Sequence, residues 1–174
     1  NDGAAFVAQA ALGNLYYNIH TSDFLGGEIR GQLLVTNDVT EGDFRTITLE
    51  GALDAAQEPD PVSDSEATGQ ATATVVQNLV TGEVTYSSDL SVVGLAESDL
   101  QTPIPGVVSA IHLHNAPIGQ NGPVVQDVIV DAGAILDTVE PISATGVVGA
   151  DVIENVIETD TLISIENVIG SDDG

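Results

Sequence analysis

Histidine is the side chain in this sequence best suited to chemistry, and it is rare. The 174 residues contain three histidines, His20, His112 and His114. Residues two apart on an extended strand share one face, so His112 and His114 would point the same way. If the segment around His20 pairs with the segment that carries the other two, all three imidazoles would converge on one patch.

Such a patch predicts a metal site. Neutral imidazole is the commonest metal ligand, and three imidazoles suit copper or zinc. Copper is favoured because its affinity for imidazole is higher. A water molecule, Asp23 or Tyr16 would supply a fourth ligand. Calcium prefers oxygen and would instead use carboxylates such as Asp127, Asp131 or the acidic loops. The alternative is that each histidine only hydrogen-bonds its neighbours.

The elements that would position the histidines are short β-strands. Apolar and polar residues alternate around both histidine segments. Ile111 and Leu113 would face a core from one strand, and Tyr17 and Ile19 from the other. The histidines would then lie on the opposite face of a shared sheet.

The rest of the chain continues this pattern. Gly13 ends an alanine-rich stretch, which predicts one short helix within residues 1–14. A short helix at 151–157 and a strand at 161–165 are less regular possibilities. We expect an all-β fold, an antiparallel sandwich or barrel of the immunoglobulin or Cu/Zn superoxide dismutase type. Its further strands are predicted at 28–35, 44–53, 69–79, 83–93 and 123–130.

The charge is strongly acidic. There are 27 acidic residues against two basic ones, Arg30 and Arg45, which gives a formal net charge of −25. This balance excludes nucleic acid as a natural partner and argues against anionic membrane surfaces. It fits a saline habitat or divalent cations that bridge carboxylates. We expect Arg30 to pair with a buried or edge carboxylate.

Other compositional features suggest an exposed, extracellular protein. The chain has no Cys, Met or Trp, which suits oxidising surroundings, and no apolar run long enough for a membrane helix. It lacks a signal peptide and begins abruptly, as a processed or excised piece would. It has no cysteine nucleophile, no Gly-x-Ser-x-Gly motif and no lysine for Schiff-base chemistry, so we expect no enzyme activity.

Three segments share motifs with a known family. Residues 49–59 read Leu-Glu-Gly-Ala-Leu-Asp-Ala-Ala-Gln-Glu-Pro, and residues 112–124 combine His-Leu-His with Asn-Gly-Pro-Val. Residues 18–33 combine Asn-Ile-His-Thr with Gly-Glu-Ile-Arg-Gly-Gln-Leu. In that order they resemble the opening, the middle and the closing hairpin of the CHRD domain, the repeat named after chordin. The closing hairpin, however, comes first in this chain.

The altered order implies a division of the chain. Residues 1–36 correspond to a helix and the closing hairpin of a CHRD unit, residues 37–43 to a linker, and residues 44–174 to the main body of a unit. The chain is then a circular permutant that closes its own fold, one period of a tandem array, or a subunit whose hairpin completes a neighbour. A body without its hairpin exposes an unpaired edge, and filling it head-to-tail generates a fibre. We favour filling by a neighbour, with self-closure as the alternative.

The resemblance and the histidines together suggest a function. We expect a secreted structural CHRD module that assembles with copies of itself into a fibre or surface layer and binds metal ions. CHRD domains in animals belong to a protein that sequesters growth factors, so the resemblance also allows a secreted module that binds a protein ligand. The few aromatic residues and two arginines weigh against that reading. A copper enzyme of the superoxide dismutase type is the third alternative, by analogy alone.

Overall fold

The computed structural model describes residues 3–60, 64–100, 109–128 and 142–148. Asp131 and the elements predicted at 151–157 and 161–165 lie outside these residues, and the side chain of Asp127 is not described. The described elements are, in chain order, α1 (Gly3–Ala11), β1 (Leu15–Ile19), β2 (Ile29–Gln32), β3 (Leu34–Glu41), β4 (Phe44–Asp54), the 3-10 turn η1 (Ala55–Gln57), β5 (Thr68–Asn78), β6 (Val84–Val93), the 3-10 turn η2 (Glu97–Asp99), β7 (Ile111–Asn115), β8 (Val124–Val128) and β9 (Ile142–Val147).

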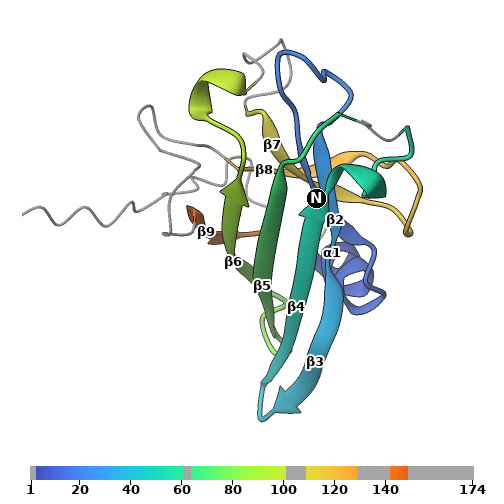
Figure 1. Ribbon diagram of the computed structural model, residues 1–174. Helices are drawn as coiled ribbons and strands as arrows, with labels where there is room; N and C mark the ends of the chain where they lie inside the picture. The colour runs from blue at the N-terminus through green and yellow to red at the C-terminus, as the bar shows by residue number, and fades with distance from the viewer. Residues whose placement is uncertain (1–2, 61–63, 101–108, 129–141, 149–174) are drawn as a thin grey trace, which may run out of the picture.

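The described strands form one curled antiparallel sheet (Figure 1). Its order is β8-β7-β1-β2-β4-β5-β6-β9, and β3 pairs with β4 beside this path. The predicted all-β fold with one short helix is therefore confirmed. Every described pairing is antiparallel.

The leading hairpin lies inside the sheet rather than at its edge. Strand β1 pairs with β2 on one side and with β7 on the other. Tyr17 lies opposite Leu113, and Ile19 opposite Ile111. All four side chains are fully buried, as their alternation predicted. Within a single chain, residues 15–32 thus complete the sheet that the downstream strands begin.

The segment expected to be a linker is instead part of a strand and its turn. Residues 34–41 form β3, which pairs with β4 from Leu34 opposite Glu50 to Glu41 opposite Phe44. Gly42 makes the tight turn with a φ of 57°, a conformation that glycine adopts at little cost. We expected irregular structure at 37–43 because that segment is polar. Strand β3 is exposed along its whole length, so its polar composition does not prevent it from forming a strand. An exposed strand can be polar on both faces because neither face meets a core.

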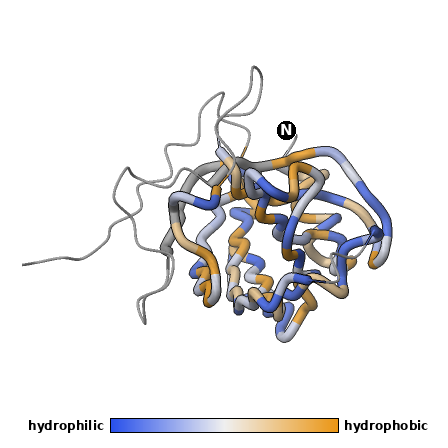
Figure 2. Tube along the Cα trace, turned by 45° about the horizontal axis from the view of Figure 1, so that its top comes forward, coloured by the Kyte–Doolittle hydropathy of each residue, from blue (hydrophilic) through white to orange (hydrophobic). Residues whose placement is uncertain are grey.

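The core lies within the curl of the sheet and under α1. Hydrophobic and polar residues alternate along the strands (Figure 2), as expected for strands with one face in a core. Helix α1 buries Phe6, Val7 and Ala10, and the Phe6 ring meets Tyr86 edge to face at 5.8 Å. Beside it the buried Tyr17 hydroxyl lies 2.5 Å from both the Tyr86 hydroxyl and the Ser88 Oγ.

Helix α1 ends where the sequence predicts. Gly13 has a φ of 68°, its N–H donates to the carbonyl of Ala10, and the N–H of Asn14 donates to the carbonyl of Gln9. These two bonds form a Schellman motif, which satisfies carbonyls that the last helical turn leaves open. The chain therefore turns directly from α1 into β1.

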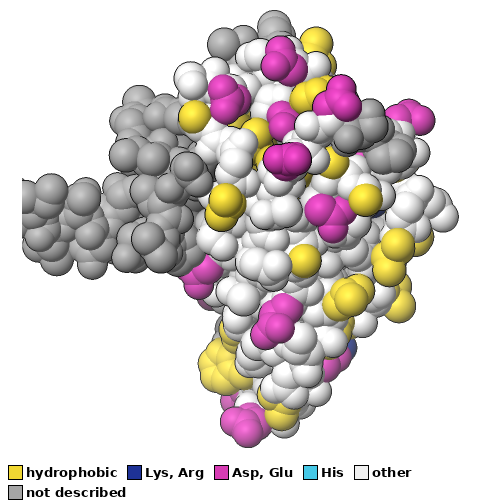
Figure 3. Space-filling model, viewed as in Figure 1, with side chains coloured by type: hydrophobic (Ala, Val, Ile, Leu, Met, Phe, Trp, Pro, Cys, Tyr) yellow, Lys and Arg dark blue, Asp and Glu magenta, His cyan; other side chains and the backbone are white. Residues whose placement is uncertain are grey.

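Acidic side chains are scattered over the visible face of the molecule (Figure 3). Among the described residues, one ion pair joins a basic and an acidic side chain, from Arg45 to Asp38 at 2.6 Å on the exposed β3–β4 hairpin. Most of the described acidic side chains are exposed. In the described part of the chain, no helix has the length and apolar character needed to cross a membrane.

Candidate metal centre

The structure brings the three histidines together, as their spacing predicted. The ring centroids of His20 and His112 are 4.9 Å apart, those of His112 and His114 5.5 Å, and those of His20 and His114 6.2 Å. Each ring offers one nitrogen to a group in which all three nitrogens lie within 4.8 Å of one another. The described acidic residues contribute no further member to this group.

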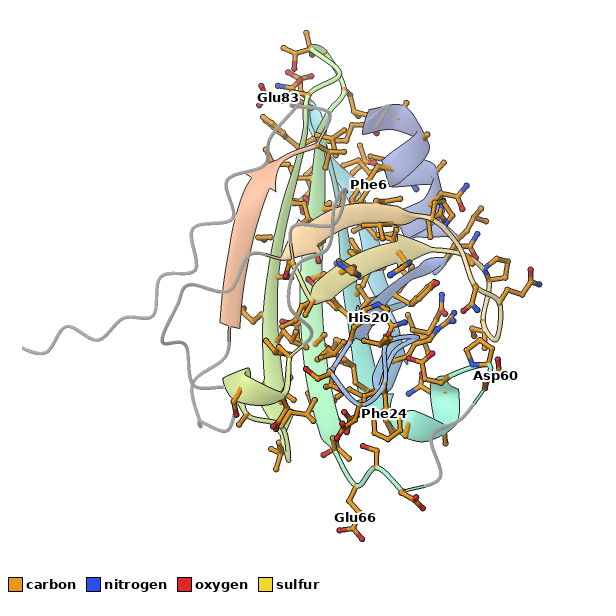
Figure 4. The ribbon with its side chains drawn as sticks, turned by 90° about the horizontal axis from the view of Figure 1, so that it is seen from above. Phe6, His20, Phe24, Asp60, Glu66 and Glu83 are labelled. Carbon is orange, nitrogen blue, oxygen red and sulfur yellow. The ribbon has the colours of Figure 1, made fainter. Side chains whose placement is uncertain are left out.

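Strand register creates this arrangement. On β7, His112 lies opposite Asn18 of β1, and His114 lies opposite Tyr16. His20 directly follows β1, and its backbone N–H donates to the carbonyl of Ala110 at 2.8 Å. Figure 4 shows His20 at the start of the loop that carries Phe24, close to the β7–β8 hairpin. Two adjacent antiparallel strands therefore present the rings on the face away from the core.

Each imidazole is held by a backbone carbonyl. His20 Nδ1 lies 3.0 Å from the Leu25 oxygen, His114 Nδ1 lies 2.9 Å from the Gly122 oxygen, and His112 Nε2 contacts the Ser109 oxygen. A carbonyl oxygen can only accept, so these nitrogens carry the protons. In a neutral imidazole the other nitrogen then has a free lone pair. This is the arrangement that orients histidines in metal sites.

Burial favours the neutral rings that a metal needs. The pKa of His114 is lowered to about 4, chiefly by burial; the hydrogen bond to Gly122 opposes this shift, and the nearby His112, His20 and Arg30 charges add to it. Burial also lowers the pKa of His20, against the hydrogen bond to Leu25. Within the described part of the chain, the Nε2 atoms of His20 and His114 are buried without a hydrogen-bond partner.

Neither side chain proposed as a fourth ligand joins the group. The Tyr16 hydroxyl accepts a hydrogen bond from the N–H of Gly122 at 3.0 Å. The Tyr16 ring stacks on His114 with centroids 4.9 Å apart and planes 12° apart. Asp23 lines a separate pocket with Glu28 and Asp99. Tyr16 therefore supports a ligand through its ring rather than offering its oxygen.

Arg30 does not make the carboxylate pair that we expected. Its guanidinium donates to the Gln120 carbonyl at 2.7 Å and to Asn121 Oδ1 at 3.3 Å. The guanidinium carbon lies 3.4 Å from the centre of the Tyr16 ring. In the described structure no ion pair includes Arg30. The aromatic face and two oxygens satisfy this cation where a carboxylate was predicted.

Sequence reasoning missed this support for the histidines. Arg30, Tyr16 and His114 form a stack of three side chains from β2, β1 and β7. Strand register places Tyr16 opposite His114, so a correct pairing of the two segments would have revealed the Tyr16–His114 contact. The β7–β8 loop, which returns over the stack through Gln120 and Gly122, has no comparable sequence signal.

Comparison with known families agrees with this structure. The CHRD domain model matches residues 2–33 and 49–162. This chain belongs to the CHRD domain family. All three histidines of this CHRD domain lie within the matched segments, whereas all of β3 lies between them. Comparisons with curated proteins and with solved structures gave no match.

Proposed function

We propose that this CHRD domain binds a transition metal ion, with copper favoured over zinc, through His20, His112 and His114. One observation carries the proposal. Three buried or half-buried imidazoles each donate one N–H to a backbone carbonyl, while one nitrogen from each ring belongs to a group within 4.8 Å. Hydrogen bonding alone would not require the rings to converge. Nitrogen ligands suit copper and zinc and do not suit calcium.

Metal titration tests this proposal directly. Metal-free protein and His112→Ala are titrated with Cu²⁺ and with Zn²⁺, and Gln77→Ala, far along β5, serves as the control. We expect His112→Ala to lose at least about 100-fold in affinity because one of three ligands is gone, while Gln77→Ala binds as the parent does. Equal affinities in His112→Ala and the parent would contradict the proposal.

We propose that the ion has a structural role and that the domain has no enzyme activity. No described acidic residue joins the three histidines to act as a general acid or base at the ion. The copper-loaded protein is therefore expected to show no superoxide turnover above that of an equal amount of His112→Ala. Catalysis that depends on all three histidines would instead establish a copper enzyme of the superoxide dismutase type.

We further propose that the domain is an extracellular module that assembles with copies of itself. Membership of the CHRD family and the acidic, cysteine-free composition support an extracellular setting. Strand β1 fills a gap between β7 and β2, and the same pairings can form between copies when the segment is exchanged. The break in the family match at residues 34–48 lies directly after this segment.

A cross-link distinguishes exchange from self-closure. Leu15 of β1 lies opposite Asn115 of β7, and paired residues of antiparallel strands lie within disulfide reach. The double variant Leu15→Cys/Asn115→Cys is oxidised, since the chain has no other cysteine. A ladder of covalent multimers on a denaturing gel is the expected result for exchange. Cross-linked monomers alone, at every protein concentration, would contradict assembly by this route.

A further inference from the structure

We propose that the three-histidine centre selects its ion by charge, and that it takes copper(I) in preference to copper(II) or zinc(II). This inference rests on the proposed metal-binding function and goes beyond it. It is carried by the neutral ligand set, the buried cation of Arg30, which stacks on the Tyr16 ring beside that set, and the lack of a fourth protein ligand among the described side chains.

The ligand set brings no negative charge to the ion. All three ligands are imidazoles, and no carboxylate joins them among the described side chains, which do not include that of Asp127. His112 is 4% exposed and His114 9% exposed, so a bound ion would be largely removed from water. The cost of burying an ion rises with the square of its charge, so a divalent ion pays about four times the monovalent cost. A neutral, buried site therefore favours the monovalent ion.

Arg30 adds a fixed positive charge on the same side. Its side chain is 1% exposed. Its guanidinium lies 3.4 Å from the Tyr16 ring centre, which is 4.9 Å from that of His114. The cation is thus within about 8 Å of a ligand ring, through side chains rather than solvent. No ion pair offsets it among the described residues. The pKa of the neighbouring Glu58 carboxyl is raised to about 7, chiefly by burial, so its negative charge is only partly developed near neutral pH.

The number of ligands points the same way. Structural zinc sites almost always have four protein ligands, and zinc held by three histidines would need water as its fourth ligand; copper(II) takes tetragonal sets. The Tyr16 hydroxyl is engaged with Gly122, and Asp23 lines another pocket. Three nitrogens suffice for copper(I). The acidic surface attracts both monovalent and divalent cations. Its electrostatic field is screened over about 8 Å at physiological salt, so the groups next to the histidines dominate the selectivity.

The selectivity is measured on the unmodified chain. Copper(I) affinity is determined without oxygen by competition with bathocuproine disulfonate in ascorbate, and zinc and copper(II) affinities by competition with chelators of known strength. We expect copper(I) to bind at least about 100-fold more tightly than zinc. Zinc or copper(II) binding as tight as copper(I) would overturn this inference alone. If none of the ions binds at the histidines, the proposed function fails as well.

Arg30→Gln tests the source of the selectivity, and Arg45→Gln is its matched control. Both variants remove one positive charge, but Arg45 is paired with Asp38 on the β3–β4 hairpin. A unit charge acts twice as strongly on a divalent ion, so Arg30→Gln should raise zinc affinity about tenfold and copper(I) affinity about threefold. Arg45→Gln should change neither, and Arg30→Lys should keep the parent preference. Equal changes for the two ions in Arg30→Gln would contradict the charge mechanism.

Asp127 provides a further check. Asp127 lies on β8, and its backbone pairs with that of His112 on β7, which makes it an acidic residue close to the histidines in strand register. Asp127→Asn should leave zinc affinity unchanged if the ligand set is neutral. A large loss of zinc affinity in this variant would identify a carboxylate ligand and overturn the inference.

Discussion

Glu58 is the buried acid whose environment is least satisfied. It is 6% exposed, and Asn18 beside it is 4% exposed. Within the described residues, Glu58 Oε1 and Asn18 Oδ1 both lack a hydrogen-bond partner. Both atoms lie so close to Gly27 that a Cβ at that position would overlap them. Burial raises the pKa of Glu58 to about 7, and the charge of Arg30 offsets only part of this rise.

This environment predicts a pH-dependent stability. The folded protein holds the Glu58 proton up to about pH 7, whereas the unfolded chain releases it near pH 4.3. The stabilisation that comes from protonated Glu58 is therefore complete below about pH 4.3 and is lost as the pH rises through about 7. In urea unfolding, Glu58→Gln should be more stable than the parent by about 1 kcal/mol at pH 8, after allowance for solvent screening, and no more stable at pH 4.

The exposed Glu83, labelled in Figure 4, provides the control for this experiment. Glu83→Gln should change stability equally at both pH values. A Glu58→Gln difference that does not vary with pH would show that the buried carboxyl keeps its ordinary pKa.

The hydroxyl group of Tyr17 should contribute to stability although it lies in the core. It contacts Tyr86 and Ser88 at 2.5 Å, and burial raises the pKa of both tyrosines. Tyr17→Phe leaves its buried partners with fewer bonds, which should cost about 1–3 kcal/mol in unfolding free energy. In a double-mutant cycle, Tyr17→Phe and Tyr86→Phe should be non-additive. Additive losses would mean that the hydroxyls act independently.

At the scale of elements, the β7–β8 loop holds the histidines through Gly122. The Gly122 carbonyl accepts from His114, and its N–H donates to Tyr16. A Cβ at this position would overlap the carbonyl oxygen of Asn115. Gly122→Ala should therefore displace the loop and weaken metal binding about 10- to 100-fold. Gly26→Ala, where a Cβ meets nothing within 4 Å, should not. Unchanged metal affinity in Gly122→Ala would show that the loop does not position His114.

The sequence predicts most of these elements because their patterns are local. Alternation located seven strands, and alanines followed by Gly13 located α1. The convergence of the histidines also followed from the two-residue period of a strand. The partner of Arg30 could not be predicted, because Gln120 and Asn121 come from a distant loop. Strand β3 was missed because an exposed strand that meets no core carries no alternation.

At the scale of the whole molecule, charge dominates. With a net charge of −25 and few ion pairs, the folded chain repels itself, and salt screens that repulsion. The melting temperature of metal-free protein should rise by about 5 °C or more between about 0.02 and 0.5 M NaCl. Calcium chloride at equal ionic strength should give a larger rise only if carboxylates bind the ion. A melting temperature that falls with salt would contradict this account.

The three carbonyls that steady the imidazoles belong to separate connections. Leu25 lies between β1 and β2, Ser109 precedes β7, and Gly122 precedes β8. An ion bound by the three rings would link all three connections through one site, in addition to the backbone of the chain. Removing the ion would destabilise these three connections together. We expect them to be the first part of the metal-free protein to show faster amide hydrogen exchange and proteolysis.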